Sequence, residues 1–178
     1  MNLHRAKLLT TIAACFLTLV FPSGSSLGDE NTSDRETVNI AKTPHEALAR
    51  ARLLHEMIRG ALQVMHRDFF DEDNAHAIPS ASLEDVFHAL LEGHHVEVRW
   101  LNVQTDVLNV DHNPRDDFER KAAKEIAKGK QEFAMAGAKQ YRFAGRIRLA
   151  SQCLKCHVKN RNTTQDRAAG LLITMPLK

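Results

Sequence analysis

The residues of this chain whose types and spacing could carry chemistry lie in one segment, Cys153-Leu154-Lys155-Cys156-His157. Two thiols at this spacing can each add to one vinyl group of the same porphyrin, and the adjacent histidine can supply an axial nitrogen to the iron. The pattern C-x-x-C-H therefore predicts one covalently attached haem c. Cys153 and Cys156 are the predicted attachment residues, and His157 is the predicted proximal ligand of the iron.

The opposite axial position of this iron needs a ligand from elsewhere in the chain, or stays open to small molecules. In one predicted helix, His55 and His66 project only about 20° apart, at ~100° per residue. They stand ~16 Å apart along the axis, so one iron cannot bind both. We favour His66 as the distal ligand, then His55, then Met65 in the apolar stripe of the same helix.

Three arginines close to the pentad in sequence are predicted to bind the haem propionates through charge-assisted hydrogen bonds. They are Arg142, Arg146 and Arg161. Arg142, Arg146 and the nearby Arg148 share one face of a predicted strand, so we expect some of these three side chains to be merely solvated.

The other histidines are weaker candidates for the iron. His112 lies in a turn, where we expect it to hydrogen-bond locally. Four more are expected on the surface: His76, His88, His94 and His95.

Zinc is an alternative metal for the pentad. Cys153, Cys156 and His157 would supply three ligands, and a structural zinc site needs four. His112 or His66 would have to complete such a site, and we favour haem over this alternative.

The first 28 residues have the pattern of a secretory signal peptide. His4, Arg5 and Lys7 form a basic start, and an apolar run follows over residues 8–21. This run is shorter than the ~20 residues of a membrane span. We therefore expect an exported, periplasmic protein with no stable membrane span after cleavage. The apolar run continues past Cys15, which favours a plain signal peptide over lipid anchoring at this cysteine.

Charge gives no argument for a nucleic-acid partner. The chain has 24 Lys and Arg against 22 Asp and Glu, and removal of Arg5 and Lys7 with the signal peptide leaves 22 of each. Loss of Cys15 leaves Cys153 and Cys156 as the only thiols, so no disulfide framework is expected in an oxidising compartment. The expected partner is a redox protein of unknown identity.

A flexible leader is expected over residues 29–42, because this segment is polar and lacks an apolar period. One domain, residues 43–178, follows. Its first helix is predicted to have Thr43 as N-cap, Pro44 at the first position and Glu46 completing a capping box. The apolar stripe of this helix extends to Phe69.

Two more helices and five strands are predicted in this domain. The second helix is capped by Ser82, buries Val86 and Leu91 among others, and stops at Gly93; the third opens at Asn113-Pro114 and ends at Gly129. The predicted strands are His95–Leu101, Asp106–Val110, Gln131–Met135, Gln140–Leu149 and Gly170–Met175. This order predicts an α+β domain, an antiparallel sheet covered on one face by the N-terminal amphipathic helices.

The sequence resembles a family of single-haem, c-type cytochrome-like domains with a PAS-like fold, found in exported bacterial proteins and sensor modules. The resemblance covers roughly residues 43–176. It rests on four features: the long first helix, the Asn113-Pro114…Phe118-Glu119 helix start, the segment Tyr141-Arg142-Phe143-Ala144-Gly145-Arg146-Ile147 before the pentad, and the strand Ala169-Gly170-Leu171-Leu172-Ile173. It implies a central antiparallel sheet with helices packed against it, and a haem between the sheet and the helical part.

The resemblance also bears on the distal ligand. The family can offer a cysteine from its N-terminal helical region for this position. The mature chain has no spare cysteine, so histidine, methionine or an open site remains.

These features predict an exported mono-haem protein that acts in electron transfer or in redox or small-ligand sensing. The sequence contains no phosphate-binding glycine loop and no nucleophile elbow. The alternative is a haem enzyme of peroxidase or nitrite-reducing type. Such an enzyme would have an open distal site, with His55 or His66 as an acid–base group instead of a ligand.

Overall fold

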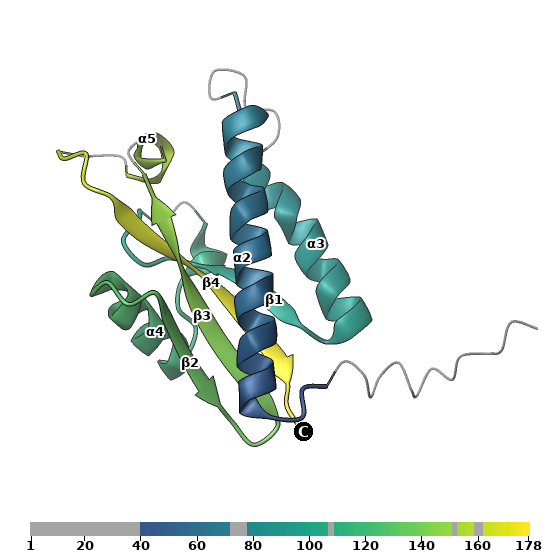
Figure 1. Cartoon of the computed structure of the whole chain (residues 1–178). Helices are drawn as coiled ribbons and strands as arrows, with labels where there is room; N and C mark the ends of the chain where they lie inside the picture. The colour runs from purple at the N-terminus through teal and green to yellow at the C-terminus, as the bar shows by residue number, and fades with distance from the viewer. Residues whose placement is uncertain (1–39, 72–77, 107–108, 151–152, 159–161) are drawn as a thin grey trace, which may run out of the picture. The chain divides into compact units, whose positions relative to one another are not determined.

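The computed structural model describes residues 40–71, 78–106, 109–150, 153–158 and 162–178 (Figure 1). The predicted signal peptide, nearly all of the leader, His76 and Arg161 lie outside these ranges and stay predictions. In the described ranges, no helix is both long enough and apolar enough to cross a membrane.

A four-stranded antiparallel sheet forms the centre of the domain, in the order β1-β4-β3-β2. Its strands are β1 (Glu97–Leu101), β2 (Glu132–Ala136), β3 (Gln140–Leu149) and β4 (Arg167–Pro176). The two central strands pair over their whole length, from Gln140 opposite Pro176 to Leu149 opposite Arg167. The prediction of an α+β domain with an antiparallel sheet is confirmed.

The long first helix, α2 (Pro44–Asp68), has 25 residues and starts as predicted. The Thr43 hydroxyl accepts a hydrogen bond from the Glu46 backbone N–H at 3.1 Å. The Glu46 carboxylate accepts the N–H of Lys42 at 2.8 Å, so the reciprocal bond of the cap forms one residue earlier than in a standard capping box. Phe69 follows the helix and is 81% exposed, so its predicted place in the buried stripe is wrong.

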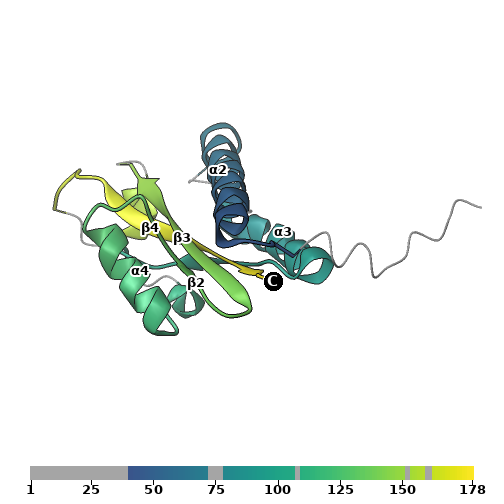
Figure 2. The ribbon, with the colours of Figure 1, turned by 60° about the horizontal axis from the view of Figure 1, so that its bottom comes forward.

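Helices cover both faces of the sheet, which corrects the prediction of one covered face (Figure 2). α2 and α3 (Pro79–His94) pack against the face that carries Phe143 and Ile147 of β3. α4 (Asp117–Ala127) packs against the other face, beside Ala144. Side chains alternate along a strand, and β3 therefore supplies both cores in turn.

The ends of α3 differ from the prediction. The helix begins at Pro79, whose fixed φ suits a first helical position, so Ser82 lies inside the first turn and does not cap it. The chain leaves the helix at His95, which adopts the left-handed conformation with φ 54°, and not at Gly93. Val86 and Leu91 are 48% and 45% exposed, so their predicted burial is also wrong.

Two further boundaries differ from the prediction. The predicted strand Asp106–Val110 includes residues 107–108, which lie outside the described part, and Val110 starts the 3-10 helix η2 (Val110–His112). The Asn109 side chain accepts the N–H of Asp111 at 2.9 Å, which closes a turn instead of extending a strand. α4 starts after Asp116, whose carboxylate caps it, and not at Asn113-Pro114.

The two ends of the domain lie side by side. Ala41 forms an isolated parallel bridge with Leu177, and the N–H of Lys178 donates to the Ala41 carbonyl at 2.9 Å. This pair lies at the end of the sheet where β3 begins, and α5 follows the other end of β3 (Figure 1).

Candidate functional site

The pentad forms a single helical turn, α5 (Leu154–His157), after the end of β3. The His157 N–H donates to the Cys153 carbonyl at 3.2 Å, which closes the turn. Leu154 is only 1% exposed and anchors the turn in the core, next to the half-buried Cys153. Cys156 is exposed. Both thiols are free, so the turn presents two cysteines that can react.

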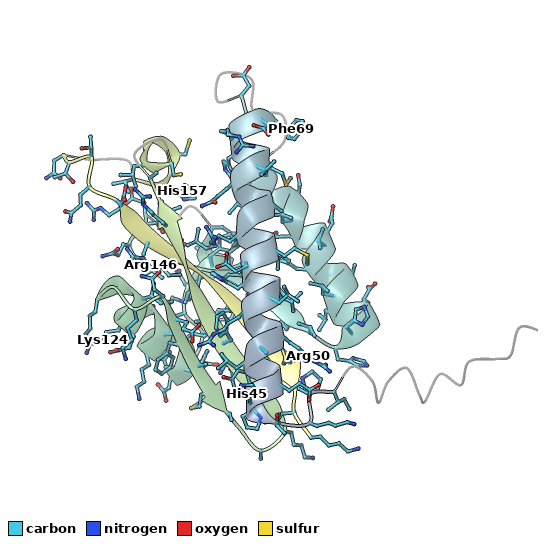
Figure 3. All side chains as sticks on the ribbon, viewed as in Figure 1. His45, Arg50, Phe69, Lys124, Arg146 and His157 are labelled. Carbon is cyan, nitrogen blue, oxygen red and sulfur yellow. The ribbon has the colours of Figure 1, made fainter. Side chains whose placement is uncertain are left out.

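His157 is the last residue of α5 and is half-buried; its side chain is labelled in Figure 3. Burial lowers the pKa of its ring, and the nearby His66 and His112 lower this pKa further. A neutral imidazole keeps a lone pair for a metal, which is the form that iron requires. The N–H of Asp106 donates to the His157 carbonyl at 3.0 Å and holds the backbone of the turn.

His66, like His112, contributes to the lowered pKa of the His157 ring. Its Nδ1 lies 2.9 Å from the Leu62 carbonyl, one turn back in α2. A carbonyl can only accept, so Nδ1 carries the proton and Nε2 has the free lone pair. The ring also packs against Phe70, with centroids 5.4 Å apart. His66 is therefore held in the tautomer that an iron ligand needs.

Met65, the third predicted distal ligand, is half-buried at the same end of α2. It packs against the core cluster that contains Leu154. Its thioether fills space in this core, and ligation by Met65 stays a prediction.

His55 lies in another part of α2, against the middle of β3. Its ring is 7% exposed and stands edge-on to Phe143, with centroids 5.8 Å apart. A Cβ on Gly145 would come within 2.2 Å of the ring, so only glycine leaves room for this histidine. A glycine inside a strand marks such a close approach. The sequence contains this signal, but it does not indicate which side chain makes the approach.

Burial lowers the pKa of His55, although the Glu56 carboxylate opposes this, so the ring is neutral. The backbone of Arg146 lies close enough to raise the pKa slightly, but no hydrogen bond of normal geometry forms. His55 Nε2 is buried and has no hydrogen-bond partner among the described residues.

A pocket of about 670 Å³ lies beside His55, between α2 and the sheet edge formed by β2 and β3. Its volume is in the usual range for small-molecule and cofactor sites. The lining is Arg52, His55, Glu56, Arg59, Gln131, Glu132, Phe143, Arg146, Arg148 and Asp166. Most of these residues were absent from the sequence prediction, because they come from elements far apart in the chain.

The arginines predicted to bind the haem propionates have different surroundings in the structure. Arg142 pairs with Asp116 at 2.7 Å and with Glu119 at 3.2 Å, and its guanidinium stacks 4.3 Å from the Phe118 ring centroid. These partners belong to α4 and its cap, on the face away from α2, so Arg142 is already engaged there. Arg146 lines the pocket, and its buried Nε lacks a partner among the described residues. Arg146 is therefore the better-placed candidate of the two.

His112 makes a local contact, as predicted, with its Nε2 3.2 Å from Asn109 Nδ2. The same nitrogen also lies 3.2 Å from a carboxylate oxygen of Glu84, in α3. The described residues contain no group of three His, Cys, Asp or Glu side chains placed to hold a metal ion. A tetrahedral zinc set is therefore not assembled in this part of the chain. His88, His94 and His95 are exposed, as predicted.

The residues present fit a c-type haem by the chemistry of their donors. Two free thiols and a neutral histidine share one turn, and a second histidine, His66 of α2, has a free Nε2. His55 and Arg146, which each carry a buried nitrogen without a hydrogen-bond partner among the described residues, are among the residues that line the neighbouring pocket.

Comparison with known proteins agrees with this fold. The Tll0287-like family model, described as Tll0287, matches residues 40–171. No curated protein matches the chain. Among solved structures, the crystal structure of the cyanobacterial heme-protein Tll0287 superposes with a TM-score of 0.53 at 17% identity, over 74% of this chain and 93% of that chain.

At this identity the structural likeness concerns the fold, and it supports the α+β architecture with an open antiparallel sheet. The PAS-like description stays an expectation. The family match spans well over half of the 178 residues. The chain therefore belongs to the Tll0287-like family, which confirms the c-type cytochrome-like resemblance.

Proposed function

We propose that this chain is an exported haem-binding protein with a single haem c attached through Cys153 and Cys156. Tll0287 itself is a cyanobacterial heme-protein, and the family match supports the same cofactor here. The free thiols of the α5 turn and the neutral His157 support covalent attachment, with His157 as proximal ligand.

We assign the distal position to His66. One observation carries this assignment: the Leu62 carbonyl holds His66 Nδ1 at 2.9 Å, so that Nε2 has the free lone pair. A hydrogen bond at the second ring nitrogen orients a ligating histidine and raises its basicity. Two strong nitrogen ligands leave no position for substrate, which favours electron transfer or redox sensing over catalysis.

The bound haem supplies one-electron chemistry, and the chain sets its environment. Leu62 and Met65, at the end of α2, pack against the core cluster that contains Leu154 and give this end an apolar surface. The exposed Cys156 would bring its thioether edge of the haem to the surface, within reach of a redox partner protein. Export to the periplasm, predicted from residues 1–28, is part of this proposal.

The test is an absorbance and electron-paramagnetic-resonance spectrum of the purified protein beside three variants. The wild type should give a peroxidase-active band on a denaturing gel and a low-spin spectrum that carbon monoxide and cyanide do not change promptly. His66→Ala should become high-spin and bind carbon monoxide. His55→Ala and the exposed control His88→Ala should stay low-spin.

Two results would contradict parts of this proposal. Absence of the peroxidase-active band would show that haem is not covalently attached. Prompt binding of carbon monoxide by the wild-type protein would exclude iron ligation by two histidines. It would favour the alternative of a haem enzyme with an open site.

A further inference from the structure

The helix α2 lies on the outside of the fold, and the other described elements leave one of its long sides uncovered (Figure 2). On this side, Leu53, Met57 and Val64 are 72%, 62% and 41% exposed. At ~100° per residue they project within about 40° of one another. They point about 135° away, on average, from the residues that α2 buries. The buried set is Ala47, Ala51, His55 and Ile58.

These side chains form a continuous row along the helix. Gly60 and Ala61 lie between Met57 and Val64 on the same side, and we call these five residues, from Leu53 to Val64, the outer row. Residues three or four positions apart are neighbours on a helix surface, and the row extends ~16 Å along the axis. Single exposed apolar side chains are normal, but a continuous apolar patch marks a surface that another molecule covers.

Gly60 gives the outer row a hollow. A glycine inside a helix costs about 1 kcal/mol relative to alanine. A Cβ at this position would meet nothing within 4 Å, so no contact among the described residues requires a glycine here. A hollow on a helix surface can accept a side chain of a second helix. Methionine, with its flexible side chain, is well suited to fill it.

The outer row is complementary to itself in one arrangement. If two α2 helices pack antiparallel with Met57 opposite Gly60, the same register places Leu53 opposite Val64. A two-fold axis makes each of these contacts twice, as an interface between identical chains requires. One register therefore pairs both large side chains of the first half of the row with smaller ones of the second half.

The charges at the ends of the row fit the same register. Arg50 and Asp68 are 18 residues apart, which is five full turns, so they project in the same direction at the two ends of the row. In the antiparallel pair, Arg50 of one copy comes beside Asp68 of the other. In a parallel pair, each of these charges would meet the same charge of the second copy, which is unfavourable.

We infer that the outer row of α2 is the interface of a dimer of this chain, in which two α2 helices pack antiparallel with Met57 of each copy over Gly60 of the other. One row of side chains covers less than the ~800 Å² per partner of a standard interface, so the dimer is weak. We expect a dissociation constant of about 1–100 μM. Under the proposed function, the His66 ends of the two helices lie at opposite ends of the pair, so both haems stay open to a redox partner.

The first test is sedimentation velocity of the mature holoprotein over concentrations that span this constant. Met57→Glu places a charge over the hollow of the second copy and should raise the dissociation constant at least about tenfold. Met135→Glu is the matched control, because Met135 is 51% exposed on β2, outside the outer row. This control should leave the dissociation constant unchanged.

The variant Gly60→Leu tests the hollow without weakening the helix. Leucine fills the space that Met57 of the second copy occupies, so the dissociation constant should again rise at least about tenfold. Leucine also favours a helix more than glycine does, so the monomer should be at least as stable as wild type in denaturant. A defect in folding would instead lower this stability.

The direction of the helices is tested by exchanging charges. Arg50→Glu should raise the dissociation constant about threefold, and Arg50→Glu combined with Asp68→Arg should restore it, because the pair then forms with its charges reversed. In a parallel dimer the second change would restore nothing.

Three outcomes overturn the inference. The first is a wild-type protein that sediments as a monomer up to about 300 μM. The second is a dimer whose dissociation constant is the same in Met57→Glu and Gly60→Leu as in Met135→Glu, since its interface would then lie elsewhere. The third is a dimer that the exchanged charge pair does not restore, which excludes the antiparallel arrangement.

Discussion

Gly145 is the residue on which the position of His55 depends. A Cβ there would approach three ring atoms of His55 to between 2.2 and 2.7 Å. We expect Gly145→Ala to destabilise the fold by about 1–3 kcal/mol, the usual cost of overpacking. The measurement is the free energy of unfolding in denaturant.

Gly60, in α2, is the matched control for this change. A Cβ there would meet nothing within 4 Å, so Gly60→Ala should stabilise the protein by about 0.5–1 kcal/mol through helix propensity. The double variant Gly145→Ala with His55→Ala should recover stability. Equal effects at the two glycines would show that the ring does not lie on the strand.

Glu119 is a buried carboxylate that forms ion pairs with two arginines, Arg99 and Arg142. It is 5% exposed, and its carboxylate accepts from the guanidinium groups of Arg99 and Arg142 and from the Arg115 N–H. Glu119→Gln removes the carboxylate partner of the poorly exposed Arg99 guanidinium and leaves Arg142 with Asp116 alone. We expect a loss of about 3–5 kcal/mol in the free energy of unfolding.

The exposed partner Glu84, bonded to His112, provides the comparison. Glu84→Gln should change the free energy of unfolding by no more than about 0.5 kcal/mol. A Glu119→Gln protein as stable as Glu84→Gln would mean that the cluster contributes little.

At the scale of elements, α4 is attached to the sheet by a pH-dependent contact. Burial raises the pKa of Asp116, but the N–H of Glu119 and the Arg142 guanidinium outweigh it and hold the pKa below its ordinary value of 3.8. A lowered folded-state pKa contributes stability that is fully present above the unfolded-state pKa and is lost as the pH falls through the folded value. α4 should therefore loosen in acid.

Asp116→Asn tests this contact, because asparagine still caps a helix but has no charge. At pH 7 the free energy of unfolding of the variant should be lower than that of wild type. The difference should be less than about 1 kcal/mol, because the ion pair is partly solvated. The difference should shrink as the pH falls below 3.8. If the difference in the free energy of unfolding does not change with pH, the ion pair is not its cause.

The helix α2 differs along its length. Ala47 and Ala51 are fully buried and let its first half lie close on the sheet, whereas Leu62 and Met65 in the second half are only partly buried. The stability of the second half of α2 should therefore depend more on a group bound between it and the α5 turn.

For the whole molecule, this asymmetry predicts what loss of haem does. A variant with Cys153→Ser and Cys156→Ser cannot attach haem covalently, and a ligand bound only to the folded state stabilises it. We expect a lower unfolding temperature than for the holoprotein. Amide hydrogen exchange should speed up around Leu62 to Met65 and stay slow around Ala47 to Ala51. Uniform loss of protection would contradict the division of α2.

The helices and strands with a clear periodicity of apolar residues could be predicted from the sequence. The stripe of α2, apart from Phe69, and the alternation of Val96, Val98 and Trp100 were confirmed, since each reflects one buried face. The cover of the second sheet face could not be predicted, because a helical stripe does not say which face it will contact. Arg142 and Arg146 were indistinguishable for the same reason: their partners lie on separate elements.

The bridge between Ala41 and Leu177 lies at one end of the domain. Ala41, close to where the described part of the chain starts, meets Leu177 at this end, and α5 follows the end of β3 at the other (Figure 1). A fusion partner or surface tether joined to either end would therefore sit away from α5. Immobilised through its ends, the domain would still present Cys156 and the end of α2 to an electrode or a soluble protein.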